Sequence, residues 1–295
     1  MDGKVSIVIP TVNRIDKLLS VLSSYLQQKN ILEIIIIDDC STDGTEKYFK
    51  DNYNSKIRFV KNESPLGAAK SKFKGIQIAK GDYILFGEDD LYLEKDYTEV
   101  LIANLLKENA DFIAGRIIYL NEQESEEDAL NRNNIFVENL YDKYFNHNFY
   151  STSTKNEDVI FLHGIYLVRT AVIRNIGIDG NYKGNGWREE TDPLIVAKSQ
   201  GRKVIFCPFT VCFHLPRGID KGGQHNNNKL IYEFWVFKNN LYFFKKNQLF
   251  LRQNNIIKGN PYKENILYMS HRIYNNYLLK IIPKFKKALK TRGGN

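Results

Sequence analysis

Residues 82–90, DYILFGEDD, join an uninterrupted apolar run to three consecutive carboxylates. The run at 83–86 has the composition of a strand buried on both faces, which is typical of a central strand in a parallel sheet. Ligands of open α/β sheets bind beyond the carboxyl ends of such strands, and alternation along an extended chain aims Glu88 and Asp90 the same way. Two carboxylates on one side suit a divalent cation such as Mg²⁺ or Mn²⁺. The alternative is a solvated acidic turn before a helix, with Asp90 or Asp96 as its N-cap.

The alternation of strands and helices extends the prediction to the first half of the chain. Strands are expected at 5–9, 34–37, 57–60 and 83–86, and helices at 16–28, 45–51 and 68–80. This order predicts an α/β fold with a mostly parallel central sheet flanked by helices. Polar residues at 11–14, 38–39 and 88–90 follow three of the strands and are expected to meet at one edge. Neither GxGxxG nor GxxxxGK[ST] occurs, so a nucleotide bound here must be held by side chains and a metal.

Composition places the chain among ordinary globular proteins and favours a reducing compartment. Its 295 residues are 43% hydrophobic and 26% charged, enough for one large or two modest domains. Three cysteines (Cys40, Cys207 and Cys212) form no CxxC pair, which argues against a disulfide framework. The first residues lack a signal-peptide pattern, and no apolar run approaches the roughly 18 residues that span a bilayer. We therefore expect a cytoplasmic protein.

Charge is unevenly distributed along the chain. Residues 217–295 contain 16 Lys and Arg against 3 Asp and Glu, a net charge of +13, whereas residues 1–216 contain 26 against 31, a net charge of −5. Apolar residues recur at helical spacing in this basic region, in two sets: Leu230, Phe234, Phe237, Leu241 and Phe244, then Ile266, Met269, Ile273, Tyr277 and Ile281. A basic segment, 283–287, follows. This pattern favours peripheral contact with the cytoplasmic face of a membrane; the alternative is a helix docked on the rest of the protein. No nucleic-acid-binding module accompanies the charge, so no nucleic-acid partner is expected.

Four stretches carry a family resemblance: VSIVIPTVNR at 5–14, IIIIDDCSTDGT at 34–45, NESPLGAAKSKFKG at 62–75 and AKGDYILFGEDD at 79–90. In this order they resemble the family 2 glycosyltransferases of the GT-A fold, which are inverting enzymes with a DxD-type metal site. The resemblance implies a catalytic domain over 1–228, with a nucleotide-sugar half at 1–115 and an acceptor half at 116–228. It leaves 229–295 as a basic, aromatic-rich helical extension.

The resemblance also implies roles for single residues. The nucleotide-binding residues would be Pro10, Thr11, Asn13, Arg14, Asp39, Gly67, Lys72 and Asp89, and the metal ligands would be Asp90, Glu88 and His214. Lys72 stands where the family usually has Arg, and Phe73 replaces a usual Asn. Three alternatives stay open, since Asp39 could cap a helix, Lys72 could be a solvated helix residue and His214 could be a plain surface or core residue.

The second half resembles the family in the block GWREETDPL, residues 186–194. The position of the family's catalytic base is occupied by Glu190, one methylene longer than the usual Asp, so Glu189 and Asp192 remain alternatives. Residues 161–169 are expected to form a strand leading into a helix of the acceptor half, and residues 203–208 are expected to form a further strand. Gly164 and Trp187 would line the acceptor site, with core packing as the alternative for Trp187.

The predicted function is metal-dependent, inverting transfer of a single sugar from a nucleotide-diphosphate sugar, with a UDP-type donor favoured. The acceptor would be a hydroxyl of a saccharide or lipid-linked saccharide, in glycan biosynthesis. A processive synthase is disfavoured because no QxxRW sequence occurs. Two alternatives remain: a non-catalytic relative that binds a sugar nucleotide or glycan, and a sugar nucleotidyltransferase, which would be expected to carry a Gly-rich loop after the first strand.

Overall fold

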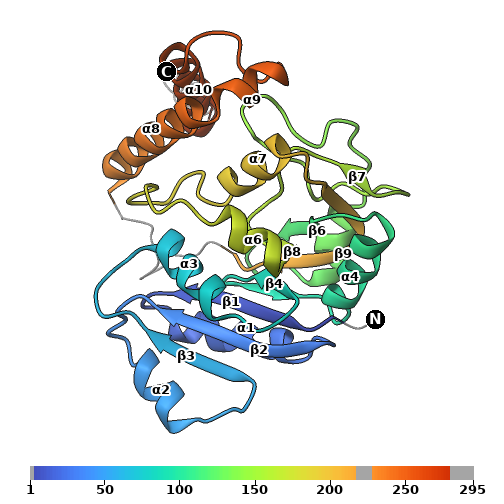
Figure 1. Cartoon of the computed structure of the whole chain (residues 1–295), viewed down its shortest axis with the longest axis vertical. Coiled ribbons are helices and arrows are strands. Elements are labelled where there is room, and N and C mark those ends of the chain that lie inside the picture. Colours follow the sequence, from blue (N-terminus) through green and yellow to red (C-terminus); the bar gives the residue numbers. More distant parts are fainter. Residues whose placement is uncertain (1–2, 217–227, 280–295) are drawn as a thin grey trace, which may run out of the picture.

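The structure, a computed structural model, describes residues 3–216 and 228–279, and within this part it centres on one nine-stranded sheet (Figure 1). The strand order is β3-β2-β1-β4-β8-β6-β9-β5, with β7 paired to β9. The strands are β1 (Val5–Thr11), β2 (Ile31–Asp38), β3 (Ile57–Lys61), β4 (Tyr83–Phe86), β5 (Leu91–Leu93), β6 (Phe112–Tyr119), β7 (Glu157–Asp158), β8 (Leu167–Arg169) and β9 (Val204–His214). The sheet is parallel from β3 to β4, as predicted, and mixed beyond β4, because β8, β5 and β7 run antiparallel to their neighbours.

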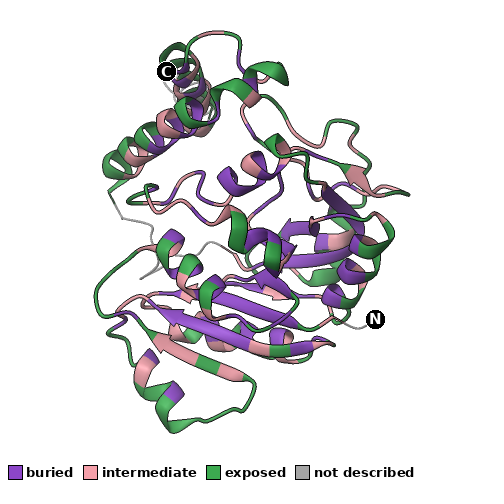
Figure 2. Ribbon diagram, in the orientation of Figure 1, coloured by how far each residue is buried: buried purple, intermediate pink, exposed green. Residues whose placement is uncertain are grey.

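Helices pack around this sheet and cover its apolar strands. They are α1 (Ile15–Leu26), α2 (Thr45–Asp51), α3 (Ala68–Ile78), α4 (Tyr97–Lys107), α5 (Glu126–Arg132), α6 (Thr170–Ile176) and α7 (Asp192–Ser199). α3 lies directly against β1, where the missing side chain of Gly75 leaves room for Val8. All four residues of β4 are buried, so the predicted central strand is confirmed (Figure 2).

Two strands differ from their prediction in ways that matter for the cavity described below. The short strand β5 starts directly after the three carboxylates, so Asp90 caps no helix; α4 begins later, at Tyr97, and its N-cap is Asp96, one of the two positions that the alternative named. The expected strand near 203–208 continues through Pro208 to His214. Proline is tolerated inside β9 because the ladder with β6 is irregular between Ala114 and Arg116. β5 and β9 pair antiparallel.

The C-terminal helices form a unit at one end of the molecule (Figure 1). They are α8 (Lys229–Lys246), α9 (Gln248–Gln253) and α10 (Pro261–Ile273), followed by a π-helical turn, Tyr274–Leu278. Within the described residues, no helix is both long and apolar enough to cross a membrane. Ile281 and the basic segment 283–287 lie outside the described residues.

α8 docks on the rest of the protein through a face that the apolar spacing does not predict. Asn239 donates a hydrogen bond to the carbonyl oxygen of Lys183 (2.7 Å). Beside it, Trp235 packs so closely on Gly184 (φ +63°) that a Cβ there would lie 2.3 Å from the indole ring. The docked alternative for this helix is therefore what the structure shows.

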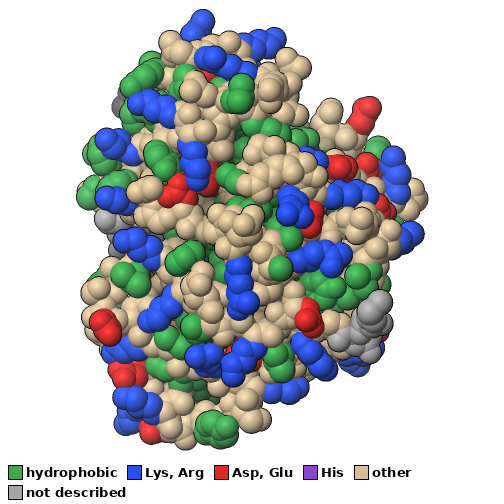
Figure 3. All heavy atoms as spheres, in the orientation of Figure 1, with side chains coloured by type: hydrophobic (Ala, Val, Ile, Leu, Met, Phe, Trp, Pro, Cys, Tyr) green, Lys and Arg blue, Asp and Glu red, His purple; other side chains and the backbone are tan. Residues whose placement is uncertain are grey.

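The predicted apolar face of α8 is instead largely turned to solvent. Leu230, Phe234 and Phe237 are 83%, 53% and 37% exposed, although Phe244 from the same predicted set is buried (Figure 2). The helix buries polar Asn240 as well as Asn239, because both amides bond to other parts of the protein. Hydrophobic side chains lie among Lys and Arg at this end of the molecule (Figure 3).

Candidate active site

A cavity of about 530 Å³ opens at the carboxyl ends of β1 and β4, and residues from all parts of the chain line it. Its lining includes Thr11 from β1, Glu88 after β4 and His214 at the end of β9. Glu190 lines it from the turn before α7, and Arg272 from α10. The polar ends of the predicted strands therefore meet at one edge of the sheet, as expected.

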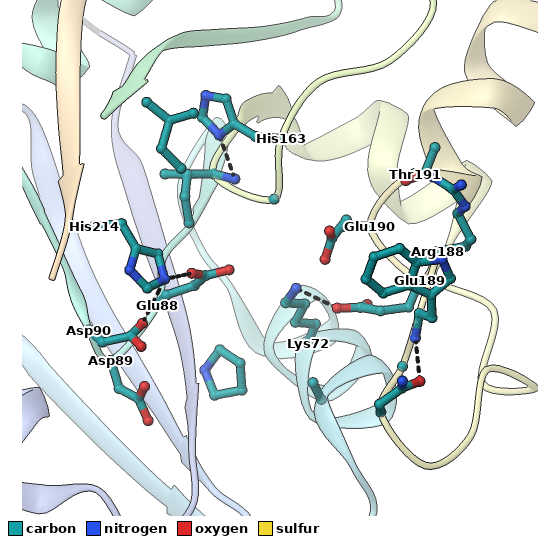
Figure 4. A pocket seen from close by; sticks show the side chains of 18 of the residues that line it. Lys72, Glu88, Asp89, Asp90, His163, Arg188, Glu189, Glu190, Thr191 and His214 are labelled. Atoms are coloured by element: carbon teal, nitrogen blue, oxygen red, sulfur yellow. Dashed lines mark hydrogen bonds and ion pairs between the residues drawn. The ribbon is translucent and has the colours of Figure 1, made fainter. Parts of the chain in front are cut away.

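Three of the lining residues converge into one group. The pairing of β5 with β9 sets Leu91 opposite His214, which brings the preceding Asp90 beside the imidazole. The Nε2 atom of His214 lies 3.6 Å from a carboxylate oxygen of Asp90 and 3.7 Å from one of Glu88 (Figure 4). Single ligand atoms of Glu88, Asp90 and His214 all lie within 4.8 Å of one another.

The surroundings of these side chains fit a divalent cation. His214 Nδ1 lies 2.8 Å from the carbonyl oxygen of Leu215, which can only accept, so Nδ1–H donates to it and Nε2 is the ring nitrogen that faces the two carboxylates. The second oxygen of Asp90 is held by Arg14 Nη2 at 3.0 Å. Oxygen and imidazole donors facing one point match the ligand preferences of Mn²⁺ and related ions. The predicted metal ligands are therefore brought together as a group that could hold a metal.

The alternative of a solvated acidic turn is wrong, because Asp89 and Asp90 are only 5% and 6% exposed. Burial, together with the neighbouring Asp90, raises the pKa of Glu88 to about 7. Burial also raises the pKa of Asp89 to about 6, against the opposing effect of Arg14. A nearby positive charge would stabilise the ionised form of these carboxylates.

Asp89 is fixed by the residues that follow β1. Thr11 Oγ1 donates to its carboxylate at 2.8 Å, and Arg14 Nη1 forms an ion pair with it at 2.7 Å. Pro10 lines the cavity beside them, whereas Asn13 does not. The side-chain oxygen of Asn13 instead accepts a hydrogen bond from the backbone N–H of Thr42 (2.7 Å), and this contact holds the turn after β2.

Asp39 lines the cavity and organises the loop before α3. Its carboxylate accepts the backbone N–H groups of Leu66 (2.7 Å) and Gly67 (2.9 Å), and the amide of Asn62 (2.8 Å). It does not cap α2, whose N-cap is Gly44. Gly67 thus lies next to the cavity, although its neighbour Ala68 is the lining residue.

Lys72 is not a solvated helix residue. It is buried, and its Nζ atom lies 2.6 Å from Oε1 of Glu189 (Figure 4). Burial alone would lower the pKa of Lys72, but the charges of Glu189, Glu190 and Glu88 raise it above its ordinary value. The exposed residue at this point of α3 is Phe73, 42% exposed.

The structure separates the three candidate bases. Glu189 is buried in its ion pair with Lys72. Asp192 is 2% exposed and lies outside the cavity lining. Its carboxylate accepts hydrogen bonds from Tyr182 (2.9 Å), Lys246 (2.6 Å) and Asn247 (2.8 Å).

Glu190 is half-buried and lines the cavity, and among the described residues its carboxylate forms no hydrogen bond or ion pair. Burial raises its pKa to about 7, with Lys72 opposing the shift. A side chain of this kind, with its pKa near neutrality and access to the cavity, can take up a proton.

Gly164 leaves space between the carboxylates of Glu88 and Glu190. A Cβ on it would lie 3.3 Å from Glu88 Oε1 and 3.5 Å from Glu190 Oε2. The predicted strand over 161–169 is shorter than expected, since β8 begins at Leu167 and residues 161–165 form the cavity wall.

Trp187 lines the cavity under a guanidinium that the sequence did not indicate. Arg272 of α10 stacks over its ring at 4.6 Å, and the two residues line the cavity together. Other lining residues that sequence reasoning missed are Arg188, Tyr232, Asn276, His147 and His163. Arg188 lies in the turn before α7, within the block 186–194. The positions of the other four follow from the docking of α8 and α10 and from the course of residues 133–165, neither of which has a sequence signal.

Comparison with known proteins gives matches of two kinds. The sequence profile described as "Glycosyl transferase family 2" matches residues 6–174. Abequosyltransferase RfbV of Salmonella typhimurium is 38% identical over 104 residues, which are 33% of this chain and 31% of that protein. Glycosyltransferase GlyG of Streptococcus pneumoniae is 32% identical over 133 residues, 43% of this chain and 42% of that protein. The matches to the first curated relatives span between 18% and 42% of those relatives' lengths.

Solved structures extend the similarity in fold to almost the whole chain. Staphylococcus aureus TarS 1–349 in complex with UDP-GlcNAc aligns with a TM-score of 0.61 at 14% identity, over 92% of this chain and 73% of that one. GalNAc-T7 with UDP, GalNAc and Mn²⁺ aligns with a TM-score of 0.62 at 16% identity, over 93% and 58%. The predicted GT-A fold is confirmed. Because the profile match covers more than half of the chain, the protein belongs to glycosyl transferase family 2.

Proposed function

We propose that this protein transfers a single sugar from a UDP-type donor to a hydroxyl of a saccharide acceptor, with inversion at the anomeric carbon. The observation that carries the proposal is the arrangement across Gly164. The carboxylates of Glu88 and Glu190 both border the space that the missing side chain of this glycine leaves, and Figure 4 shows Glu190 on the side of Glu88 away from His214. The space between them suits a sugar whose leaving group and acceptor approach from opposite sides.

Asp90, Glu88 and His214 would hold a divalent cation at the donor end. When bound there, the cation supplies a positive charge for the phosphate oxygens on which negative charge develops as the diphosphate leaves. Arg14 holds both Asp89 and Asp90 in place. The named ligands of the solved relatives, UDP-GlcNAc in TarS and UDP with Mn²⁺ in GalNAc-T7, support a UDP-type donor and a cation such as Mn²⁺.

Glu190 would act as the general base. Its carboxylate takes the proton of the acceptor hydroxyl while the acceptor oxygen bonds to the anomeric carbon and the bond from that carbon to the diphosphate oxygen breaks. The transition state is oxocarbenium-like, as in glycosidases. Lys72 would restrain Glu189, so that only one of the two adjacent glutamates is available in the cavity.

The surface of the C-terminal helices relates to the class of acceptor that the enzyme uses. We propose that the catalytic unit ends near residue 228 and that residues 229–295 form the helical extension. The exposed face of Leu230, Phe234 and Phe237, in a strongly basic part of the sequence, supports peripheral contact with the cytoplasmic face of a membrane. A lipid-linked saccharide would then be an acceptor that the enzyme meets at that surface.

The test is a screen of UDP, GDP, TDP and CDP sugars with the full chain, with and without Mn²⁺. Thermal shift reports binding, and release of the nucleoside diphosphate reports donor cleavage. We expect a UDP-sugar to stabilise the protein only with the cation present, and Asp90→Ala to abolish that effect. Sugar transfer at the wild-type rate by Asp90→Ala in EDTA would contradict the metal-dependent mechanism.

A further inference from the structure

Two guanidinium groups lie over the ring of one tryptophan in the cavity lining. Arg188 comes from the turn before α7 and Arg272 from α10, and both line the cavity beside Trp187. Figure 4 shows Glu190 between Glu88 on one side and Arg188 on the other. Arg188 therefore lies on the side of the candidate base away from the proposed metal ligands, and Arg272 adjoins it at the ring of Trp187.

Arg188 is buried without a carboxylate partner among the described residues. Its Nε donates to Asn240 Oδ1 (2.9 Å) and its Nη2 to the carbonyl oxygen of Tyr144 (3.1 Å), both neutral acceptors. The guanidinium also lies over the rings of Phe145 (4.6 Å) and Tyr268 (5.2 Å). These contacts orient the group without pairing it directly to a carboxylate, and the charge of Glu190 acts on it through space.

The backbone of Arg188 is itself in an unfavourable conformation. Its φ of +76° lies in the left-handed region that residues with a side chain rarely adopt. Such strain persists only where the surrounding structure enforces it, and it is concentrated at binding sites. Here the hydrogen bond that Arg188 Nε donates to Asn240 Oδ1 ties the strained turn to α8.

Arg272 is prearranged in a similar way. Its Nε and Nη2 atoms form a fork with the carboxylate of Glu233 (2.7 and 3.0 Å), and Tyr277 donates to the same carboxylate. The plane of the guanidinium is thus held over Trp187. In the described part of the chain, no acceptor is found for Nη1 of either Arg188 or Arg272, and neither atom is sealed from solvent.

We propose that these two guanidiniums bind an anionic group, a phosphate or a carboxylate, on the sugar acceptor. The inference rests on the proposed function and adds the chemical class of its acceptor. A planar guanidinium presents paired N–H groups that match the oxygens of either anion. The fixed orientation of both groups lowers the entropy lost on binding.

The experiment measures binding of matched sugars to the full chain after saturation with UDP and Mn²⁺, which blocks the donor end. The probes are glucose, glucose 6-phosphate and glucuronate, so that neutral, phosphate-bearing and carboxylate-bearing rings are compared by calorimetry. We expect at least one charged sugar to bind about tenfold or more tightly than glucose, and Arg272→Gln to remove that preference. Arg188→Gln should do the same if it folds. The exposed Arg252 on α9, outside the cavity, supplies the control Arg252→Gln, which should keep the preference.

The proposal is overturned if the protein binds neither charged sugar more tightly than glucose, whether all three sugars bind with the same affinity or none binds. It is also overturned if the preference survives in Arg272→Gln. The preceding UDP titration separates this result from the proposed function. A chain that binds UDP with Mn²⁺ but shows no preference for anions loses only the anionic acceptor, whereas a chain that binds no nucleotide loses the proposed function itself.

Discussion

Lys72 and Glu189 are 117 residues apart in the sequence and form a buried ion pair with 2.6 Å between Nζ and Oε1. The pair ties α3, at one side of the cavity, to the turn that precedes α7. Because Glu190 follows Glu189 directly, this contact also fixes where the next carboxylate enters the cavity. A substitution at Lys72 therefore tests stability and active-site geometry together.

Replacing Lys72 should destabilise the protein strongly. Lys72→Met leaves the charge of Glu189 buried and uncompensated, and its Oε2 atom already has no hydrogen-bond partner. Loss of one partner of a buried pair costs about 3–5 kcal/mol, measured as the free energy of unfolding in urea. Lys70→Met, at an exposed position of the same helix, is the matched control and should change stability little. A small effect of Lys72→Met would show that the pair does not hold α3 to this turn.

Glu190 should set the pH dependence of sugar transfer. Burial raises its pKa to about 7, and a general base acts only when deprotonated. The value of kcat/KM should therefore fall about tenfold per pH unit below neutrality and level off above it. Glu190→Gln should lower kcat about 10²- to 10⁴-fold and remove this dependence, while the affinity for UDP stays unchanged. Full turnover by Glu190→Gln would assign the base to another residue.

Asp192 should behave differently from Glu190, although both lie in the same acidic block. Its carboxylate is bonded to Tyr182, Lys246 and Asn247, so Asp192→Asn disturbs a buried network that joins α7 to α8. We expect a loss of about 1–3 kcal/mol in unfolding free energy, with the pH profile of transfer unchanged. A shifted pH profile of sugar transfer with an unchanged unfolding free energy would instead show that Asp192 takes part in the reaction.

The exposed apolar residues of α8 should control membrane association. Replacing Leu230, Phe234 and Phe237 by Ser removes three side chains, each worth about 1.5–3 kcal/mol when fully transferred from water. Flotation with phosphatidylglycerol vesicles should then show at least about tenfold weaker binding. Leu249→Ser is the control, since Leu249 is equally apolar, 71% exposed and on α9 instead of α8. Unchanged flotation of the triple variant would exclude this face as the contact.

Much of the first half of the fold could be predicted because local signals and long-range structure agree there. The apolar runs of β1, β2 and β4 end at polar turns, and parallel strands bring those turns to one edge. This reasoning placed Thr11, Asp39 and Asp90 at the cavity. The roles of these residues in binding a nucleotide or a metal stay predictions.

The second half was less predictable because its geometry depends on contacts between distant segments. The three-residue strand β5 is too short to give a periodic signal, yet its pairing with β9 sets Asp90 beside His214. The apolar repeat of α8 indicated a helix but not which face is buried, since Asn239 and Asn240 dock by hydrogen bonds instead of apolar packing. Arg272 reaches the cavity only because α10 folds back on α8.

Binding of Mn²⁺ to the full chain, followed by electron paramagnetic resonance with and without UDP, tests the central claim most directly. We predict one bound Mn²⁺ per chain, tighter binding in the presence of UDP, and loss of that site in Asp90→Asn. The account is contradicted if wild-type protein binds no Mn²⁺ in the presence of UDP, or if Asp90→Asn binds it as tightly as wild type.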